Sequence, residues 1–223
     1  MPSNRKMKLR YFRKIFLQST DVLEVIDKGS GSQHFKSGSR NVKDIAKYAG
    51  MPWHKTKLIN KIISYLNIET ALELGTSVGL GSLAMAVNHT KSIIETVEAC
   101  PNTSAYAINK FKELDLENIR VFNYDFSFFL NNISQYKAYD LIYIDGHHNK
   151  ESTLEYFDLI QKHIHEYSLV ILDDIYWSKG MQAAWQIICK QENVKVSIDL
   201  YFWGIIFFNP DLSKQHYKIR CFF

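Results

Sequence analysis

The sequence predicts an α/β fold whose sheet is mostly parallel and ends in an antiparallel hairpin. Three observations lead to this fold class. Segments suited to buried strands alternate with helical segments from Glu69 onward, a glycine-rich turn follows the first strand, and the last two strands are too close for a crossover helix. We therefore expect a seven-stranded, mostly parallel sheet with a C-terminal antiparallel hairpin, helices on both faces, and an N-terminal helical arm.

Each of the first five expected strands is followed by an expected helix. In chain order, the pairs are 70–75 with 80–89, 92–98 with a helix opened by Pro101, 119–124 with 126–133, 139–145 with 151–163, and 169–174 with 182–191. Such alternation is typical of parallel strands joined by right-handed crossovers. The remaining strands, 194–201 and 205–208, read as a hairpin, which places an antiparallel strand in the sheet.

The region before this alternation has a different composition. Residues 1–20 contain six basic residues before any acid, interleaved with apolar ones: Arg5, Lys6, Lys8, Arg10, Arg13 and Lys14. A surface helix that docks its apolar side on the domain is the favoured interpretation, and a patch for phosphate or a membrane surface is the alternative. Residues 28–40 are rich in glycine and serine and read as a loop, either a cover for a ligand or a plain linker.

We divide the chain into a basic arm with its glycine- and serine-rich loop, residues 1–40, and a domain, residues 41–223. Within that domain, Asn41–Tyr48 reads as a short helix, and Pro52 reads as the first residue of a second one.

Composition narrows the class of protein. The 223 residues suit one elaborated domain, and the net charge of +4 is too small to indicate nucleic acid. No apolar run is long enough to span a bilayer, and the basic N-terminus lacks the apolar stretch of a secretory signal. Cys100, Cys189 and Cys221 match neither a disulfide framework nor a zinc pattern, so we expect a cytoplasmic protein.

The glycine-rich turn at residues 75–81 predicts a nucleotide site of the Rossmann-like kind. The three glycines follow the pattern G-x-x-x-G-x-G, whereas dinucleotide folds use G-x-G-x-x-G, so an NAD site is the weaker interpretation. About twenty residues further on, the strand 92–98 ends in Glu98, at the spacing of a carboxylate that accepts hydrogen bonds from ribose hydroxyls.

Carboxylates gather at the ends of all five expected parallel strands. They are Glu73, Glu98, Asp125, Asp145 and the pair Asp173–Asp174. His147 and His148 follow the fourth of these strands. Ligands of open α/β sheets bind outside the carboxyl ends of the strands, so we expect these side chains to form the functional site.

These motifs resemble those of class I S-adenosylmethionine-dependent methyltransferases, in the bacterial small-molecule part of the catechol-O-methyltransferase-like branch. The resemblance rests on the acidic-x-Gly-x-x-x-Gly turn, on the segment Ile144–His148 and on the segment Leu172–Trp177, and it covers roughly residues 40–210. It implies that Glu98 holds the cofactor ribose and that Asp125 with Phe126 contacts the adenine. The other implied cofactor-binding residues are Glu73, Gly75, Thr76, Ser77, Gly79 and Asp145.

Metal-dependent members of this branch hold a divalent cation with carboxylates at the ends of the fourth and fifth strands. The resemblance therefore implies a metal site made by Asp145, Asp173 and Asp174, for Mg²⁺ or another cation that prefers oxygen ligands. The chain departs from the plant and animal pattern, because Asp174 stands in place of an asparagine and His148 stands near the place of a lysine. A metal-free mechanism with a histidine base stays open.

We expect an enzyme that transfers a methyl group from S-adenosylmethionine to a small molecule, with oxygen favoured over nitrogen as the nucleophile. His148 is the expected base and Asp145 its catalytic neighbour. Two alternatives stay open: an NAD-dependent oxidoreductase on a Rossmann-like fold, and a cofactor-binding protein without catalysis. A small-molecule methyl acceptor is the expected partner, a nucleic acid is not, and a homodimer is an open oligomeric state.

Overall fold

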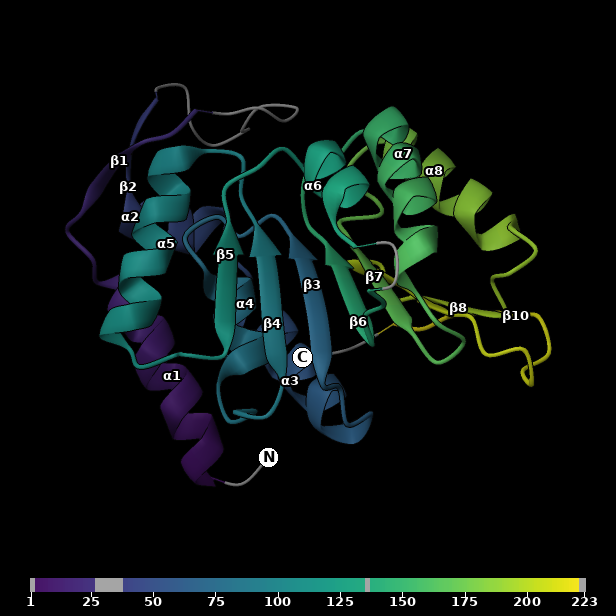
Figure 1. The fold of residues 1–223 in the computed structure, drawn as a ribbon, viewed down its shortest axis with the longest axis horizontal. Coiled ribbons are helices and arrows are strands. Elements are labelled where there is room, and N and C mark those ends of the chain that lie inside the picture. The colour runs from purple at the N-terminus through teal and green to yellow at the C-terminus, as the bar shows by residue number, and fades with distance from the viewer. Residues whose placement is uncertain (1–2, 27–37, 135–136, 221–223) are drawn as a thin grey trace. The chain divides into compact units, whose positions relative to one another are not determined.

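The computed structural model describes residues 3–26, 38–134 and 137–220 (Figure 1). The chain divides into two compact units, residues 1–124 and residues 125–223. The predicted loop at residues 28–40 lies mostly outside the described residues, and its last two residues begin a short strand.

Three parallel strands form the centre of the first unit. They follow the order β3 (Thr70–Leu74), β4 (Ile93–Val97) and β5 (Ile119–Phe122), and they run side by side in Figure 1. The apolar residues of β3 and β4 are almost all buried, as expected for strands covered on both faces. Glu73 pairs in register with Thr96, which brings a carboxylate and a hydroxyl together on neighbouring strands.

Five helices and a two-stranded ribbon complete the described part of this unit. The helices are α1 (Ser3–Leu17), α2 (Val42–Tyr48), α3 (Trp53–Tyr65), α4 (Leu80–Ala86) and α5 (Pro101–Glu113). The ribbon pairs β1 (Val22–Glu24) with β2 (Ser39–Asn41) in antiparallel register. Pro52 is the N-cap residue of α3 and not its first helical residue, because its ψ of 162° is extended; this corrects the predicted position by one residue.

The basic arm docks on the first unit through apolar side chains. Leu9 and Phe16 of α1 are completely buried, and the helix packs against α2 and α4. The Arg13 guanidinium donates a hydrogen bond to the Met51 carbonyl, and its burial lowers the pKa of that side chain. The favoured interpretation of residues 1–20 is therefore confirmed, while the outer face of α1 still carries cations such as Lys8 and Lys14.

The described residues of the second unit form five strands, in the order β10-β8-β9-β7-β6. Their bounds are β6 (Leu141–Ile144), β7 (Leu169–Asp173), β8 (Val196–Asp199), β9 (Trp203–Phe207) and β10 (Gln215–Lys218). β9 is antiparallel to both β7 and β8, whereas β6 is parallel to β7 and β10 is parallel to β8. The carboxyl ends of β6, β7, β8 and β10 therefore lie at one edge.

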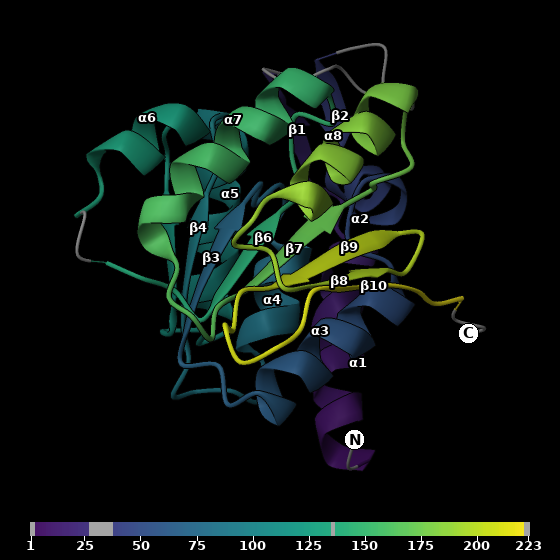
Figure 2. The same cartoon turned by 90° about the vertical axis from the view of Figure 1, so that its right-hand side faces the viewer.

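The helices of this unit are α6 (Phe126–Asn132), α7 (Lys150–Ile160) and α8 (Lys179–Lys190), and a short 3₁₀ helix, η1 (Gln161–His163), follows α7. In Figure 2 the three α-helices lie above the strands of the unit. Asn149 and Ser178 cap α7 and α8 with their side-chain oxygens, so both helices start at residues with a strong preference for that position.

The predicted fold class is confirmed. All seven expected strands and the helices between them form, and the terminal segments make the expected antiparallel hairpin. The strand β10 is an addition that the sequence did not predict, because its four residues are all exposed and show no alternation of apolar and polar side chains. No helix within the described ranges has the length and apolar character needed to cross a membrane.

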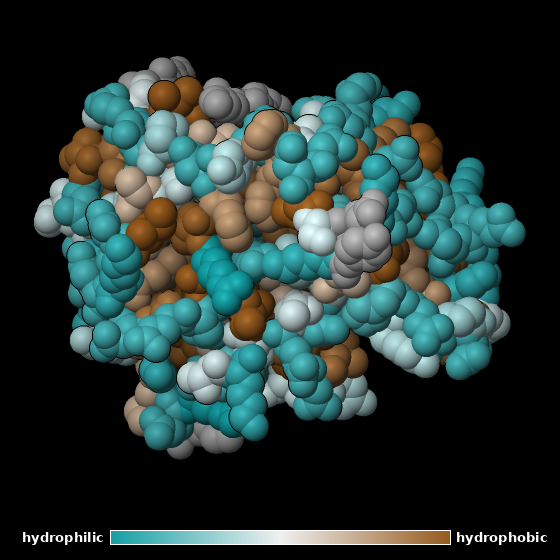
Figure 3. Space-filling view, in the orientation of Figure 1, coloured by the Kyte–Doolittle hydropathy of each residue, from teal (hydrophilic) through white to brown (hydrophobic). Residues whose placement is uncertain are grey.

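The surface mixes polar and apolar side chains. Hydrophilic residues cover most of the face shown in Figure 3, with hydrophobic groups between them. Among the large hydrophobic side chains that are exposed, Tyr65 is 85% exposed and Tyr11 is 63% exposed. Such scattered residues are normal on protein surfaces and do not by themselves indicate an interface.

We predict that Gly79→Ala destabilises the protein by on the order of 2 kcal/mol. Gly79 has a φ of +99°, where a side chain is strained, and an added Cβ would lie 2.5 Å from Cζ of Phe111. Gly180→Ala, in α8, is the control, because its added Cβ would make only ordinary contacts, at 3.5 Å from Cβ of Lys150 and from Oγ of Ser178. Urea unfolding of both variants checks this, and equal free energies of unfolding would contradict it.

Candidate functional site

A buried carboxyl group lies beneath the glycine turn of the first unit. Glu73, near the end of β3, is 1% exposed and accepts hydrogen bonds from the hydroxyls of Ser82 and Thr96, the latter at 2.6 Å. Gly81 allows this packing, because a Cβ at that position would collide with the Glu73 carboxyl oxygen. Burial raises the pKa of Glu73 to about 7, and the two hydroxyl donors oppose the rise.

A continuous series of polar contacts leads from Glu73 to Glu98. The Thr96 hydroxyl also lies 2.6 Å from the hydroxyl of Thr76, the second residue of the turn. The next residue, Ser77, has a φ of 49° and donates its backbone N–H to Oε2 of Glu98 at 2.9 Å. The geometry of the turn is thereby tied to the carboxylate that follows β4.

Glu98 is held at two points but keeps its carboxylate partly exposed. Its Oε1 accepts the backbone N–H of Cys100 at 2.8 Å, and its Oε2 accepts that of Ser77. The residue is half-buried, and an ionised carboxylate has about four lone-pair sites that can accept hydrogen bonds. Such a carboxylate is preorganised to accept bonds from neighbouring hydroxyls, as a ribose diol offers.

The glycines of the turn serve the protein's own packing. Gly75 and Gly79 have positive φ values of 112° and 99°, and Gly79 lies against the ring of Phe111. Gly81 lies against Glu73. The G-x-x-x-G-x-G spacing is therefore explained by two left-handed backbone positions and one close contact with a carboxyl group.

A second cluster lies at the carboxyl ends of β6 and β7 in the second unit. The Tyr143 hydroxyl donates to Oδ2 of Asp173 at 2.6 Å and lies 3.2 Å from Oδ2 of Asp145. Nε2 of His148 lies 3.6 Å from Oδ1 of Asp145, and its ring lies 5.8 Å from that of Trp177. The side chains of His148 and Asp145 are 22% and 25% exposed, so both can reach a ligand.

The two adjacent histidines have different surroundings. His147 has a φ of 48°, and its Nδ1 is hydrogen-bonded to the hydroxyl of Tyr156. Its ring packs against Tyr156 and, at 5.4 Å between ring centres, against Phe126. Burial raises the pKa of Tyr156 to about 12, so this hydroxyl stays protonated at neutral pH and can donate to His147. His147 is therefore part of an aromatic cluster, whereas His148 is paired with a carboxylate.

Asp125 and Phe126 have structural partners of their own. Asp125 is the N-cap of α6, and its Oδ1 accepts the backbone N–H groups of Ser127 and Phe128. Phe126 is 6% exposed. These contacts explain the local conformation, and the predicted contact of both residues with adenine stays a prediction.

The three predicted metal ligands are not arranged as an ion-binding cluster. Both oxygens of Asp173 accept hydrogen bonds, Oδ2 from Tyr143 and Oδ1 from the backbone N–H of Asp174 at 2.8 Å. The Tyr143 hydroxyl bridges the two carboxylates, at 3.2 Å from Oδ2 of Asp145 and 2.6 Å from Oδ2 of Asp173. Within the residues that the structure describes, no group of three or more histidine, cysteine or acidic side chains could hold a metal ion. The predicted site of Asp145, Asp173 and Asp174 for a divalent cation stays a prediction of the sequence.

Sequence reasoning missed three of the residues that organise these clusters: Tyr143, Thr96 and Ser82. Tyr143 precedes Asp145 by two residues, so the alternation of a strand places both on one face and could have indicated their contact. Thr96 lies beside Glu73 because of the register between β3 and β4, and this register cannot be predicted from the sequence alone.

Comparison with known proteins agrees with this fold. The family described as a methyltransferase domain matches residues 72–175. No curated protein matches the sequence. A putative caffeoyl-CoA O-methyltransferase from Staphylococcus aureus is 20% identical, with 74% of this chain and 88% of that chain covered and a TM-score of 0.63.

Two further solved structures contain the cofactor or its product. An O-methyltransferase from Bacillus cereus in complex with SAH is 15% identical over 93% of this chain and 91% of that chain, with a TM-score of 0.61. TomG of Streptomyces achromogenes, an O-methyltransferase in complex with SAM, is 14% identical over 71% of this chain and 81% of that chain, with a TM-score of 0.61. At these identities the likeness shows the fold.

We predict that Glu73→Gln removes a pH dependence of stability. The free carboxyl loses its proton near pH 4.5, whereas the folded protein retains it up to about pH 7. The stabilisation is therefore complete below about pH 4.5 and is lost as the pH rises toward 7, a loss on the order of 3 kcal/mol.

The measurement is urea unfolding at pH 5 and pH 7.5, with Glu117→Gln as control because Glu117 is exposed. From pH 5 to pH 7.5, the free energy of unfolding should fall more in wild type and in the control than in Glu73→Gln. The same pH dependence in all three proteins would show that Glu73 is ionised in the folded state.

Proposed function

The chain carries a methyltransferase domain over residues 72–175, and from this premise we propose that it transfers a methyl group from S-adenosylmethionine to an oxygen of a small molecule. The predicted resemblance and enzyme class are confirmed by the family match and by the methyltransferase fold. The observation that carries the proposal is the series of contacts from Glu73 to Glu98, which holds the Glu98 carboxylate beside the glycine turn.

The cofactor would be held by residues of the first unit. The turn from Gly75 to Gly79 supports its methionine part, and Glu98 accepts hydrogen bonds from its ribose hydroxyls. When bound, S-adenosylmethionine supplies an electrophilic methyl group on a sulfonium, which is intrinsically reactive toward an oxygen lone pair. The protein's remaining tasks are to align the acceptor and to remove its proton.

His148 is the proposed base. Asp145 faces Nε2 of the imidazole and so favours the tautomer with its proton on that nitrogen. Nδ1 then has the free lone pair that takes the acceptor's hydroxyl proton while the oxygen bonds to the methyl carbon and the carbon–sulfur bond breaks. Asp145 stabilises the imidazolium that forms, and the proton later leaves to water.

The divalent cation stays a prediction of the sequence and takes part in no step above. A cytoplasmic location, a homodimer, the division at residue 40 and the exclusion of nucleic acid as a partner are also predictions. An acceptor with two adjacent phenolic hydroxyls is a suitable first probe, since the resemblance is to catechol-O-methyltransferase-like enzymes.

Glu98→Gln should weaken binding of S-adenosylhomocysteine at least about tenfold, because two hydrogen bonds to a charged acceptor contribute about 1.5–3 kcal/mol each. The amide cannot accept bonds on both of its arms. Calorimetric titration measures the affinity, and Glu113→Gln controls for the loss of charge at an exposed site. Unchanged affinity in Glu98→Gln would exclude Glu98 as the ribose acceptor.

His148→Ala should lower turnover of 3,4-dihydroxybenzoate by about 10²–10⁴-fold and leave cofactor affinity nearly unchanged. His147→Ala should lower the melting temperature, since His147 packs in an aromatic cluster, but should lower turnover much less. The rates are measured with EDTA and with Mg²⁺. Small and equal losses for both variants would exclude His148 as the base, and a rate that requires Mg²⁺ would support the cation instead.

A further inference from the structure

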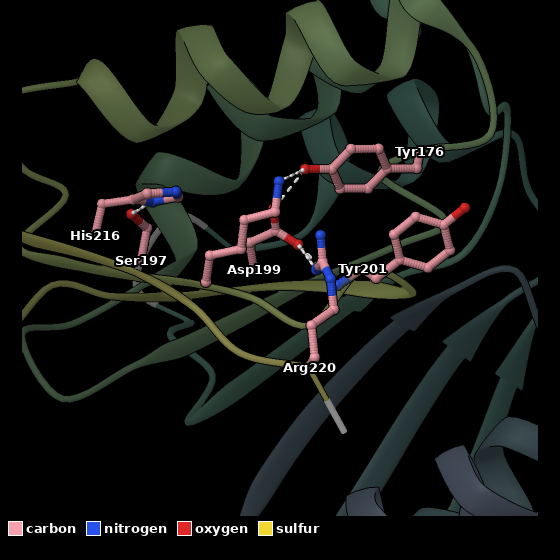
Figure 4. A network of polar contacts seen from close by, with 7 residues as sticks. Tyr176, Ser197, Asp199, Tyr201, His216 and Arg220 are labelled. Carbon is pink, nitrogen blue, oxygen red and sulfur yellow. Dashed lines mark hydrogen bonds and ion pairs between the residues drawn. The ribbon is translucent and has the colours of Figure 1, made fainter. Parts of the chain in front are cut away.

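A second buried carboxylate lies at the carboxyl edge of the second unit, outside the cluster described above. Asp199, the last residue of β8, is 2% exposed. The Tyr176 hydroxyl donates to its Oδ2 at 2.6 Å, and the backbone N–H of Tyr201 donates to its Oδ1 at 2.7 Å (Figure 4). A buried carboxylate is unfavourable unless it is hydrogen-bonded and its charge is balanced, so Asp199 depends on these partners.

The balancing charges come from the C-terminal end of the chain. Nζ of Lys218 lies 3.7 Å from Oδ2 of Asp199, and a guanidinium nitrogen of Arg220 lies 3.8 Å from Oδ1. Lys218 also donates to the Tyr176 hydroxyl at 3.0 Å, which leaves that hydroxyl's own proton for Asp199. Lysine, tyrosine and aspartate thus form one directed series of hydrogen bonds.

The aromatic rings strengthen the same assembly. The rings of Tyr176 and Tyr201 stack with their centres 4.9 Å apart and their planes at 20°. Lys218 lies over the Tyr176 ring at 5.3 Å, and Arg220 lies over the Tyr201 ring at 5.4 Å. Each cation therefore contacts both the carboxylate and one ring of the stack.

Tyr176 belongs to the loop that follows β7, and this loop carries residues of the His148 cluster. We call residues 174–178 the acceptor loop. Its first residue, Asp174, has a φ of 50° and donates its N–H to the Phe202 carbonyl at 3.0 Å. The N–H of Trp177 donates to the Asp174 carbonyl at 2.8 Å, and the Trp177 ring lies beside His148.

The strand β10 buries little apolar surface, since all four of its residues are exposed. Its backbone pairs in parallel with β8, and this direction brings Lys218 and the following residues to the edge where Asp199 lies. The strand β10 therefore contributes backbone pairing with β8 and two cations close to Asp199, and little apolar burial.

We propose that the C-terminal segment 215–220 positions the acceptor loop for methyl transfer, with Lys218, Arg220, Asp199 and Tyr176 as positioning residues. The inference rests on the proposed function, because it assigns the acceptor to the His148 cluster. Lys218 and Arg220 balance the charge of Asp199, Asp199 holds the Tyr176 hydroxyl, and Tyr176 fixes the backbone on either side of it. Trp177 is thereby kept beside His148.

Hydrogen exchange followed by mass spectrometry tests the positioning without any need for activity. Tyr176→Phe and Lys218→Met should raise amide exchange in a peptide containing residues 174–177 by about fivefold or more, with other peptides unchanged. Tyr217→Phe is the matched control, because it removes an exposed hydroxyl from the same strand, and Lys218→Arg should restore exchange toward wild type.

Steady-state kinetics with 3,4-dihydroxybenzoate as the probe acceptor gives the second readout. Tyr176→Phe should raise KM for the probe or lower kcat by about three- to tenfold, while affinity for S-adenosylhomocysteine stays at the wild-type value. If wild type does not methylate the probe, that acceptor is wrong for the proposed function, and the exchange result alone decides the positioning.

Two results would overturn the proposal. If amide exchange at residues 174–177 is the same in Tyr176→Phe and Lys218→Met as in the control Tyr217→Phe, the C-terminal segment does not hold the acceptor loop. A rise spread over all peptides of both variants would show that the network only stabilises the fold.

Discussion

The burial of the Glu73 carboxyl beneath the glycine turn is the constraint on which the rest of the first unit depends. A carboxyl group at 1% exposure needs donors, and Ser82 and Thr96 supply them from α4 and β4. The position of Thr96 then fixes Thr76, and through the turn it fixes the N–H that Ser77 offers to Glu98. A polar group that is costly to bury thus sets the geometry of the half-buried Glu98 carboxylate.

The second unit contains two further buried carboxylates that accept hydrogen bonds from hydroxyl groups. Asp173 and Asp199 are buried at the ends of β7 and β8, and each accepts a short hydrogen bond from a tyrosine hydroxyl. In the first case the tyrosine links Asp173 to Asp145 and so to His148. In the second it links Asp199 to the loop that carries Trp177. Buried acids therefore hold two partly exposed side chains in place, those of His148 and Trp177.

Much of this arrangement could be predicted from the sequence, because it follows from local patterns. The alternation of apolar strands and helices predicted the elements from β3 to β9, and the G-x-x-x-G-x-G pattern predicted the glycine turn between β3 and α4. The sequence predicts His148 and not His147 as the base. In the structure His148 lies beside Asp145, whereas His147 is hydrogen-bonded to Tyr156.

The rest depends on strand register and tertiary contacts. The pairing of Glu73 with Thr96 follows from how β3 aligns with β4, which no local pattern fixes. The hydrogen-bond partners of Asp173 are a strand tyrosine and a backbone N–H, and a count of carboxylates in the sequence reveals neither of them. The strand β10 was not predicted because its sequence shows no apolar periodicity. It is held by backbone pairing with β8 and by the ion pairs of Lys218 and Arg220 with Asp199.

The central claim is that the turn and Glu98 form a site for S-adenosylmethionine and not for a dinucleotide. Calorimetric titration of the wild-type protein with S-adenosylhomocysteine and, separately, with NAD tests it most directly. The account predicts saturable binding of one S-adenosylhomocysteine per chain and no saturable heat with NAD. Saturable binding of NAD without binding of S-adenosylhomocysteine would contradict it.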